Sequence, residues 1–167
     1  MIKVLFVCHG NICRSLMAEF VFRDMVQKEG LGHSFHIASS ATSREEIGNG
    51  VHQGTKKKLK EVGISTEGKT AVQLTKKDYE DYDYIIGMED FNLRNMKRII
   101  GEDTEGKVSR LLDFTDSPRD IDDPWYTGKF DQTYKEVYEG CQGLLEYIKR
   151  NHREQLDSDF PIQDIKE

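Results

Sequence analysis

The segment from Met1 to Gly30 constrains the fold most, because an apolar run is followed at once by a helical pattern. Residues 2–8 form a short apolar run that is bounded by Gly10, which is typical of a buried strand. Beyond the loop, apolar side chains recur at the spacing of one helix face, at Met17, Phe20, Val21 and Met25. The chain therefore begins with a strand, a loop and a helix, in that order.

The same alternation continues along the chain. Further strands are expected at residues 35–39, 83–88 and 107–112, the last of them the weakest. Helices are expected over residues 55–62, around 93–100 and over 130–148. Strands that alternate with helices predict an α/β fold in which helices cover both faces of a parallel sheet. Such sheets bind their ligands at the carboxyl ends of the strands.

One domain accounts for most of the chain, since domains commonly contain about 100–200 residues. We expect this domain to span residues 1–152. Residues 153–167 are polar, contain one proline and show no repeated apolar face, so we expect them to form a flexible acidic tail.

The loop between the first strand and the first helix carries the residues best suited to chemistry. Its sequence is Cys8-His9-Gly10-Asn11-Ile12-Cys13-Arg14. The spacing between Cys8 and Arg14 lets one turn of backbone surround a tetrahedral dianion, with N–H groups and a helix N-terminus directed inward. Arg14 can hold two phosphate oxygens, and the same positive field favours a thiolate on Cys8. We predict a phosphate-binding loop with Cys8 as the nucleophile.

Cleavage of a phosphate ester also needs a proton for the departing oxygen. The best donor lies in residues 120–126, where Pro124 restrains the backbone beside Asp123. A loop position lets this carboxyl group reach over the phosphate, so Asp123 is the predicted general acid. Asp122 and Asp120 are the fallback candidates.

Neighbouring side chains have expected supporting roles. Ser15 can donate a hydrogen bond to the sulfur of Cys8, and Asn11 suits backbone angles that most residues resist. Trp125 and Tyr126 are expected to form an apolar wall for an aromatic leaving group.

Charge and cysteine content narrow the possible partners. A formal net charge of −6 argues against nucleic acid or an anionic membrane surface, which would repel the protein at long range. Three cysteines, two of them close together, do not suit a secreted disulfide framework and indicate a cytoplasmic protein. A zinc site built from Cys8, His9 and Cys13 lacks a suitably spaced fourth ligand, so no metal or other cofactor is expected.

Over about residues 2–150 the chain resembles the low-molecular-weight protein tyrosine phosphatases. The resemblance is carried by motifs in the family's order and spacing: VLFVCHGNICRS at 4–15, AE at 18–19, SSATS at 39–43, IGN at 47–49, QLT at 73–75, DYII at 83–86, NLR at 92–94 and DPWY at 123–126. It implies a flavodoxin-like sheet of four parallel strands and catalysis without a metal.

The resemblance also implies a role for each matching residue. Cys8 becomes the nucleophile that carries a phosphocysteine intermediate, Arg14 the phosphate clamp, and Asp123 the acid that later activates water. Ser15, Asn11 and Ser39 belong to the network that orders the loop, and Cys13 can form a reversible disulfide with Cys8. The implied substrate is phosphotyrosine in a protein or peptide.

Three positions depart from the family's usual pattern. Glu45 stands where an aromatic residue often lines the cleft, and His9 replaces a more commonly apolar residue at the rim. The segment around Lys69 lacks the family's frequent His and Arg, so the loop is expected to be supported differently there.

Two alternatives use the same loop. A protein arginine phosphatase is disfavoured, because relatives of that type carry Thr where Ile12 stands. An arsenate reductase needs further cysteines to relay a disulfide, and Cys141 lies on the apolar stripe of the last helix, which favours packing in the core.

A different class is suggested by residues 63–70, which match the nucleotide-binding pattern G-x4-G-K-T. That function requires a strand before Gly63 and a helix after Thr70. The preceding residues 55–62 have a helical pattern, so Gly63 is expected to end a helix.

Overall fold

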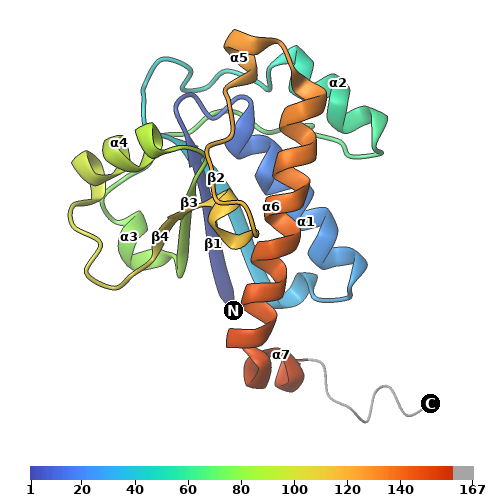
Figure 1. Ribbon diagram of the computed structural model, residues 1–167, viewed down its shortest axis with the longest axis vertical. Coiled ribbons are helices and arrows are strands. Elements are labelled where there is room, and N and C mark those ends of the chain that lie inside the picture. Colours follow the sequence, from blue (N-terminus) through green and yellow to red (C-terminus); the bar gives the residue numbers. More distant parts are fainter. Residues whose placement is uncertain (160–167) are drawn as a thin grey trace.

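A parallel sheet forms the centre of the computed structural model, which describes residues 1–159 (Figure 1). Its four strands lie in the order β2-β1-β3-β4. They are β1 (Ile2–Cys8), β2 (Phe35–Ala41), β3 (Tyr84–Gly87) and β4 (Val108–Arg110). Every pairing is parallel, so all four carboxyl ends lie at the same edge of the sheet.

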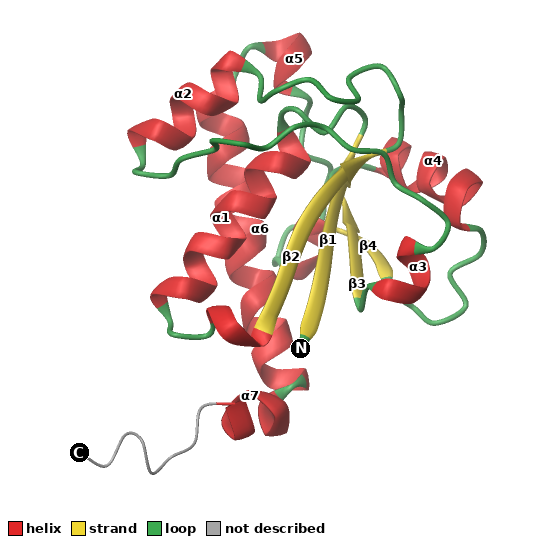
Figure 2. Ribbon diagram, turned by 180° about the vertical axis from the view of Figure 1, so that it is seen from behind, coloured by secondary structure: helices red, strands yellow, loops and turns green. Residues whose placement is uncertain are grey.

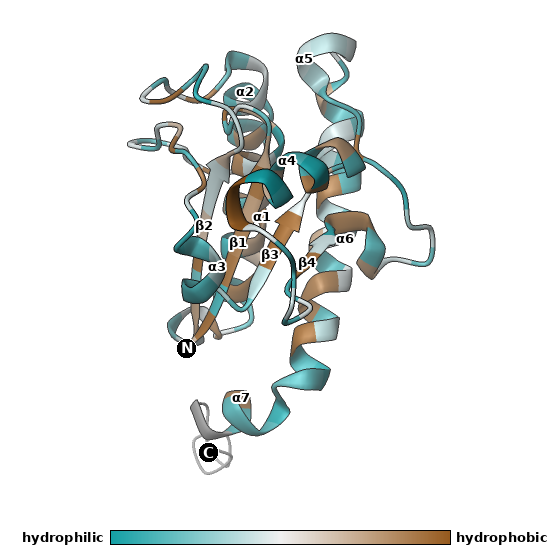
Figure 3. Ribbon diagram, turned by 90° about the vertical axis from the view of Figure 1, so that its left-hand side faces the viewer, coloured by the Kyte–Doolittle hydropathy of each residue, from teal (hydrophilic) through white to brown (hydrophobic). Residues whose placement is uncertain are grey.

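The central strand β1 shows why this sheet is buried on both sides. Val4 and Phe6 pack into one hydrophobic cluster, whereas Leu5 and Val7 pack into a second cluster. Successive side chains of a strand point to opposite faces, so an unbroken apolar run needs a cover on each face. Figure 3 shows this hydrophobic strand enclosed by helices.

Helices supply both covers (Figure 2). One face is covered by α1 (Arg14–Lys28) and α6 (Phe130–Asn151), which contact each other. The other face is covered by α3 (Asp78–Asp81) and α4 (Asp90–Ile100). The remaining helices are α2 (Gln53–Glu61), α5 (Pro124–Thr127), α7 (Arg153–Asp159) and the short 3-10 turns Gly32–Ser34 and Leu111–Phe114. The expected flavodoxin-like α/β fold is confirmed.

The limits of three expected strands differ from the structure, and β3 is one residue shorter at each end than the expected 83–88. Strand β2 continues two residues beyond the expected end at residue 39, to Ala41. Strand β4 stops at Arg110 instead of continuing to residue 112, because the side chain of Asp113 accepts a hydrogen bond from the Arg110 N–H and turns the chain. Leu111 and Leu112 are buried, but in a 3-10 helix.

Residues 153–159 begin the segment that was expected to form a flexible tail. They form helix α7, and Leu156 packs into the core with only 6% of its surface exposed. A single leucine gives no periodic signal in the sequence, so the pattern did not predict this short helix. The rest of the expected tail, residues 160–167, lies outside the described residues.

Close packing of α6 depends on glycine. A side chain at Gly143 would collide with the backbone carbonyl of Phe114, whose carbon lies 2.9 Å from the position of an added Cβ. This contact brings α6 against the 3-10 turn that follows β4. Within residues 1–159, no helix has both the length and the apolar character needed to cross a bilayer.

Candidate active site

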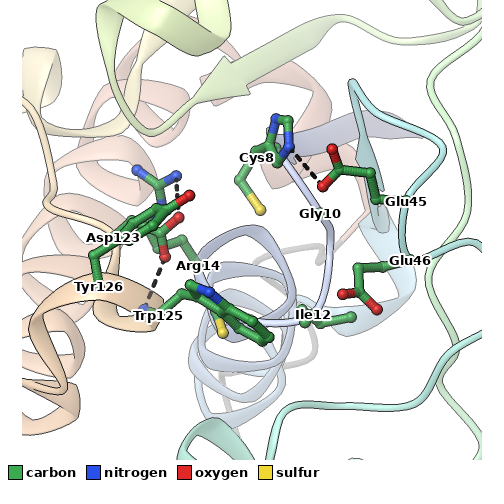
Figure 4. A pocket seen from close by; sticks show the side chains of 11 residues that line it. Cys8, Gly10, Ile12, Arg14, Glu45, Glu46, Asp123, Trp125 and Tyr126 are labelled. Carbon is green, nitrogen blue, oxygen red and sulfur yellow. Dashed lines mark hydrogen bonds and ion pairs between the residues drawn. The ribbon is translucent and has the colours of Figure 1, made fainter.

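The pocket of interest lies where β1 ends and α1 begins (Figure 4). Its volume of about 120 Å³ is small beside the roughly 300–1,000 Å³ of pockets for larger ligands, so it suits a phosphate group. Three segments distant in sequence line it: Cys8, His9, Gly10, Ile12, Cys13 and Arg14; Glu45 and Glu46; and Asp123, Trp125 and Tyr126. Cys8 ends strand β1, and the others belong to loops or helix ends at the carboxyl edge of the sheet.

The loop after β1 curls around the sulfur of Cys8. The backbone N–H groups of Asn11 and Ser15 donate to Cys8 Sγ at 3.3 and 3.4 Å. The hydroxyl oxygen of Ser15 lies 3.1 Å from the same sulfur. Asn11 has a φ of 58°, which places it in the left-handed region that asparagine tolerates better than most residues. The N–H groups therefore surround a position where negative charge is stabilised.

The side chain of Asn11 holds this curl from behind. It is fully buried and donates to Ser15 Oγ at 2.8 Å and to Ser39 Oγ at 2.9 Å. Its oxygen accepts a hydrogen bond of 3.2 Å from the Val72 N–H. The structure thus brings together Asn11, Ser15 and Ser39, the three residues expected to order the loop.

A second layer of charges, which the sequence analysis did not assign, supports Ser39. The Ser39 hydroxyl donates to Glu19 Oε1 at 2.5 Å, and Glu19 forms ion pairs with Arg23 at 2.6 Å and with Lys69 at 3.3 Å. The Lys69 ammonium also donates to the backbone oxygen of Ser39 at 3.1 Å. The loop was expected to be supported differently around this position, and Lys69 provides that support through Ser39.

Arg14 is buried at the start of α1 and is held from several sides. Its guanidinium contacts the Glu89 carboxylate, donates to the Ile121 carbonyl at 2.9 Å and lies 3.4 Å from Asp123 Oδ2. Burial by itself lowers the pKa of Arg14, but the nearby Cys8, Asp123 and Glu89 outweigh it and raise the pKa above its usual value. Arg14 thus remains a cation in the pocket.

Glu89 is a partner of Arg14 that the sequence analysis missed. It directly precedes α4, and its N–H donates to Asn92 Oδ1 at 3.1 Å, which orients the turn after β3. A signal was present, since an acidic residue close after a buried parallel strand lies at the edge where ligands bind.

Asp123 is the aspartate of the 120–126 segment that lines the pocket. It caps α5, where its Oδ1 accepts a hydrogen bond of 3.0 Å from the Trp125 N–H and Pro124 takes the first helical position. Asp120 instead binds Arg110 at 3.0 Å, and Asp122 is exposed outside the pocket lining. The geometry favours Asp123 over both fallback candidates.

Trp125 and Tyr126 stand on the side of the pocket that carries Asp123, with 55% and 83% of their surfaces exposed. The Trp125 ring packs edge-on against His52, with ring centroids 5.3 Å apart. This exposure leaves both rings available to contact a ligand that enters the pocket.

The other two cysteines differ in position. Cys13 lines the same pocket as Cys8, and burial raises the pKa of its thiol to about 12. Cys141 is fully buried in the core on α6, as its place on the apolar stripe predicted. Among the described residues, no third thiol therefore reaches the pocket, which removes the relay that an arsenate reductase needs.

Residues 63–70 do not form a nucleotide-binding loop. Gly63 follows α2 with a φ of 80° and donates its N–H to Lys60 O at 3.0 Å, as expected for the end of a helix. The chain after Thr70 is not helical, and Lys69 is directed to Ser39. Within the described part of the chain, no group of three or more His, Cys, Asp or Glu side chains is placed to hold a metal.

Comparison with known proteins gives one consistent result. The family model for low molecular weight phosphotyrosine protein phosphatase matches residues 3–154. The low molecular weight protein-tyrosine-phosphatase YfkJ of Bacillus subtilis is 40% identical over 152 residues, which cover 90% of this chain and 97% of that protein. PtpA of Staphylococcus epidermidis is 37% identical, over 90% of this chain and 96% of its own length.

Solved structures agree with the sequence relatives. The crystal structure of YfkJ superposes with a TM-score of 0.87 and covers 90% of this chain and 96% of that chain. A structure described as a drosophila arginine phosphatase gives a TM-score of 0.80 at 28% identity, over 89% of this chain and 98% of that chain. The chain therefore belongs to the low molecular weight protein tyrosine phosphatase family and is a phosphatase.

Proposed function

We propose that the protein hydrolyses phosphotyrosine in proteins or peptides through a phosphocysteine intermediate on Cys8. The observation that carries this proposal is the loop of N–H groups around Cys8 Sγ, with the guanidinium of Arg14 and the carboxyl group of Asp123 at the same pocket. Nucleophile, phosphate clamp and proton donor are thus available to one phosphate group.

In the first step the Cys8 thiolate attacks phosphorus, so that an S–P bond forms and the bond to the phenolic oxygen breaks. Asp123 donates its proton to that oxygen, and tyrosine leaves. Arg14 and the loop N–H groups stabilise the charge on the phosphoryl oxygens.

In the second step water attacks the phosphocysteine and gives a proton to the Asp123 carboxylate. The S–P bond breaks, which returns Cys8 and releases inorganic phosphate. Neither step uses a cofactor. The residues that act in the two steps all lie at the pocket.

The aromatic wall supports phosphotyrosine as the substrate. Trp125 and Tyr126 are exposed beside the pocket, where they can contact a phenyl ring. Arginine phosphate is a second candidate because one relative is described as an arginine phosphatase. The apolar side chain of Ile12 at the pocket suits a ring better than a guanidinium group.

The partner we propose is accordingly a phosphotyrosine protein, and the compartment is the cytoplasm. The net charge of −6 supports a partner other than nucleic acid or an anionic membrane. The cysteine content supports the compartment, since three cysteines, two of them close together, do not suit a secreted disulfide framework.

The test is a turnover panel of phosphotyrosine, phosphoserine and phosphoarginine peptides, with EDTA present and thiol reductant held constant. We expect the phosphotyrosine peptide to be the best substrate and EDTA to have no effect. Cys8→Ser should abolish turnover but keep binding of tungstate, a phosphate analogue, measured by calorimetry. Residual turnover by Cys8→Ser would refute the covalent intermediate.

The proton donor has a separate test. Asp123→Asn should slow the hydrolysis of aryl phosphates most where the leaving group is the poorest, because such a group depends most on protonation. A series of substituted phenyl phosphates measures this dependence. Equal slowing across the series would assign Asp123 another role.

We also propose that Cys13 protects Cys8 by a reversible disulfide, since both thiols line one pocket. Peroxide oxidises the Cys8 thiolate to a sulfenic acid, and the Cys13 thiol then condenses with it and releases water. After mild peroxide, mass spectrometry should find a Cys8–Cys13 bond that a dithiol reverses. Cys8 sulfinic acid as the sole product would contradict the proposal.

A further inference from the structure

Two carboxylates, Glu45 and Glu46, line the pocket on the side away from Trp125 and Tyr126 (Figure 4). Both belong to the loop that follows β2. The Glu45 side chain is 72% exposed, and its carboxylate lies 3.2 Å from His9 Nε2. This contact with the phosphate-binding loop keeps a mostly solvated side chain at the pocket.

Glu46 is held more tightly than Glu45. Its Cγ would lie 3.4 Å from a Cβ added at Gly10, so its methylene groups pass closely over the phosphate-binding loop. Its carboxylate accepts a hydrogen bond of 2.5 Å from Asn49 Nδ2. The negative charge is therefore placed beside the opening by packing and by a hydrogen bond.

The mouth of the pocket carries a net negative charge. Among the residues that line it, Arg14 is the one permanent cation, and it lies buried against Glu89 and Asp123. Arg44, the neighbour of Glu45, donates to Gln73 Oε1 at 3.2 Å and is absent from the pocket lining. The phosphate thus binds at a positive floor, while the part of the substrate outside faces carboxylates.

We propose that Glu45 and Glu46 make the enzyme select phosphotyrosine that is flanked by lysine or arginine, an inference that rests on the proposed phosphotyrosine activity. When the phosphate is bound by the loop and the ring lies beside Trp125, the rest of the bound peptide lies outside the pocket, at its mouth. Cationic flanking side chains can pair there with the two carboxylates, and acidic ones are repelled. The net charge of −6 adds a long-range attraction for basic peptides.

The test compares two phosphotyrosine peptides of equal length that differ in having either lysine or glutamate on both sides of the phosphotyrosine. An exposed ion pair changes an equilibrium by about threefold, so two of them predict a preference of about tenfold in kcat/KM for the lysine peptide. In a double variant, Glu45→Gln with Glu46→Gln, the preference should fall to about twofold, and about 0.5 M salt should reduce the wild-type preference similarly.

Two further variants make the result specific. Glu67→Gln removes an exposed carboxylate outside the active-site pocket and should keep the full preference. A second double variant, Glu45→Lys with Glu46→Lys, should favour the glutamate peptide over the lysine peptide, an inversion that a loss of folding cannot imitate.

Equal kcat/KM for the two peptides in the wild type would overturn the inference, as would an undiminished preference in the double variant. Both outcomes leave phosphotyrosine hydrolysis itself intact. If the wild type hydrolyses p-nitrophenyl phosphate but neither peptide, the proposed substrate class fails and the inference fails with it.

Discussion

Replacement of Asn11 by alanine tests whether one buried amide holds the phosphate-binding loop together. Asn11 is fully buried and has a φ of 58°. Its side chain donates to Ser15 and Ser39 and accepts from the Val72 N–H, at 2.8, 2.9 and 3.2 Å. Asn11→Ala removes all three bonds and keeps the unusual backbone angle.

The magnitude follows from these contacts. Each hydrogen bond contributes about 1 kcal/mol net to stability, and the buried partners lose theirs at the same time. A left-handed conformation costs alanine about 1–2 kcal/mol, part of which asparagine avoids. We expect Asn11→Ala to lower the free energy of unfolding by about 3–4 kcal/mol, the sum of these effects.

Urea denaturation measures the loss, and kcat/KM for an aryl phosphate should fall by about 100-fold because the loop N–H groups lose their positions. Asn11→Gly should be about 1 kcal/mol more stable than Asn11→Ala, since glycine adopts a positive φ without strain. Asn95→Ala, which removes a half-buried amide on α4, is the control and should stay within about 0.5 kcal/mol of wild type. A similarly small effect for Asn11→Ala would refute the reasoning.

Three more predictions use other contacts. Glu89→Gln should lower kcat/KM by about tenfold with little change in folding, because the charge that orients Arg14 is lost; unchanged kinetics would contradict this. Because burial raises the pKa of Cys13 from 9.0 to about 12, its contribution to stability is present below pH 9 and lost as the pH rises towards 12. The stability difference between wild type and Cys13→Ala should therefore shrink over that range, by at most about 1.4 kcal/mol per pH unit, and a constant difference in denaturation curves would count against it. Gly143→Ala should lower the free energy of unfolding by about 1–3 kcal/mol through its collision with Phe114, although alanine favours helices elsewhere; a stabilised variant would refute the collision.

Much of the fold follows from hydrophobic pattern alone. The limits of β1 agree with the expected residues 2–8, because an unbroken apolar run needs cover on both faces. The stripe on α6 likewise predicted a core helix, and Cys141 is fully buried there. The pattern failed where one contact decides the local structure. Asp113 turns the chain after β4, and Leu156 of α7 packs into the core.

The residues of the site likewise include some that the sequence predicts and some that it does not. Contiguous spacing identified Cys8 and Arg14, because a loop of one turn is encoded by neighbouring residues. Glu89 was missed because it meets Arg14 only after β3 pairs with β1, a contact between residues 75 positions apart. Such a partner becomes visible only when the order of the strands is known.

Lys69 shows how pairing decides a role that a motif leaves open. As the lysine of the G-x4-G-K-T pattern, Lys69 would be expected to bind phosphate. That role requires a free ammonium group at the start of a helix. Here the following segment runs beside the end of β2 instead, where Ala41 accepts a hydrogen bond of 2.8 Å from Leu74 and donates one of 2.8 Å to Val72. That pairing carries Lys69 behind the loop, where its ammonium meets Glu19 and the Ser39 carbonyl. The lysine therefore supports the loop after β1 from behind, through Ser39, whose hydroxyl accepts a hydrogen bond from Asn11.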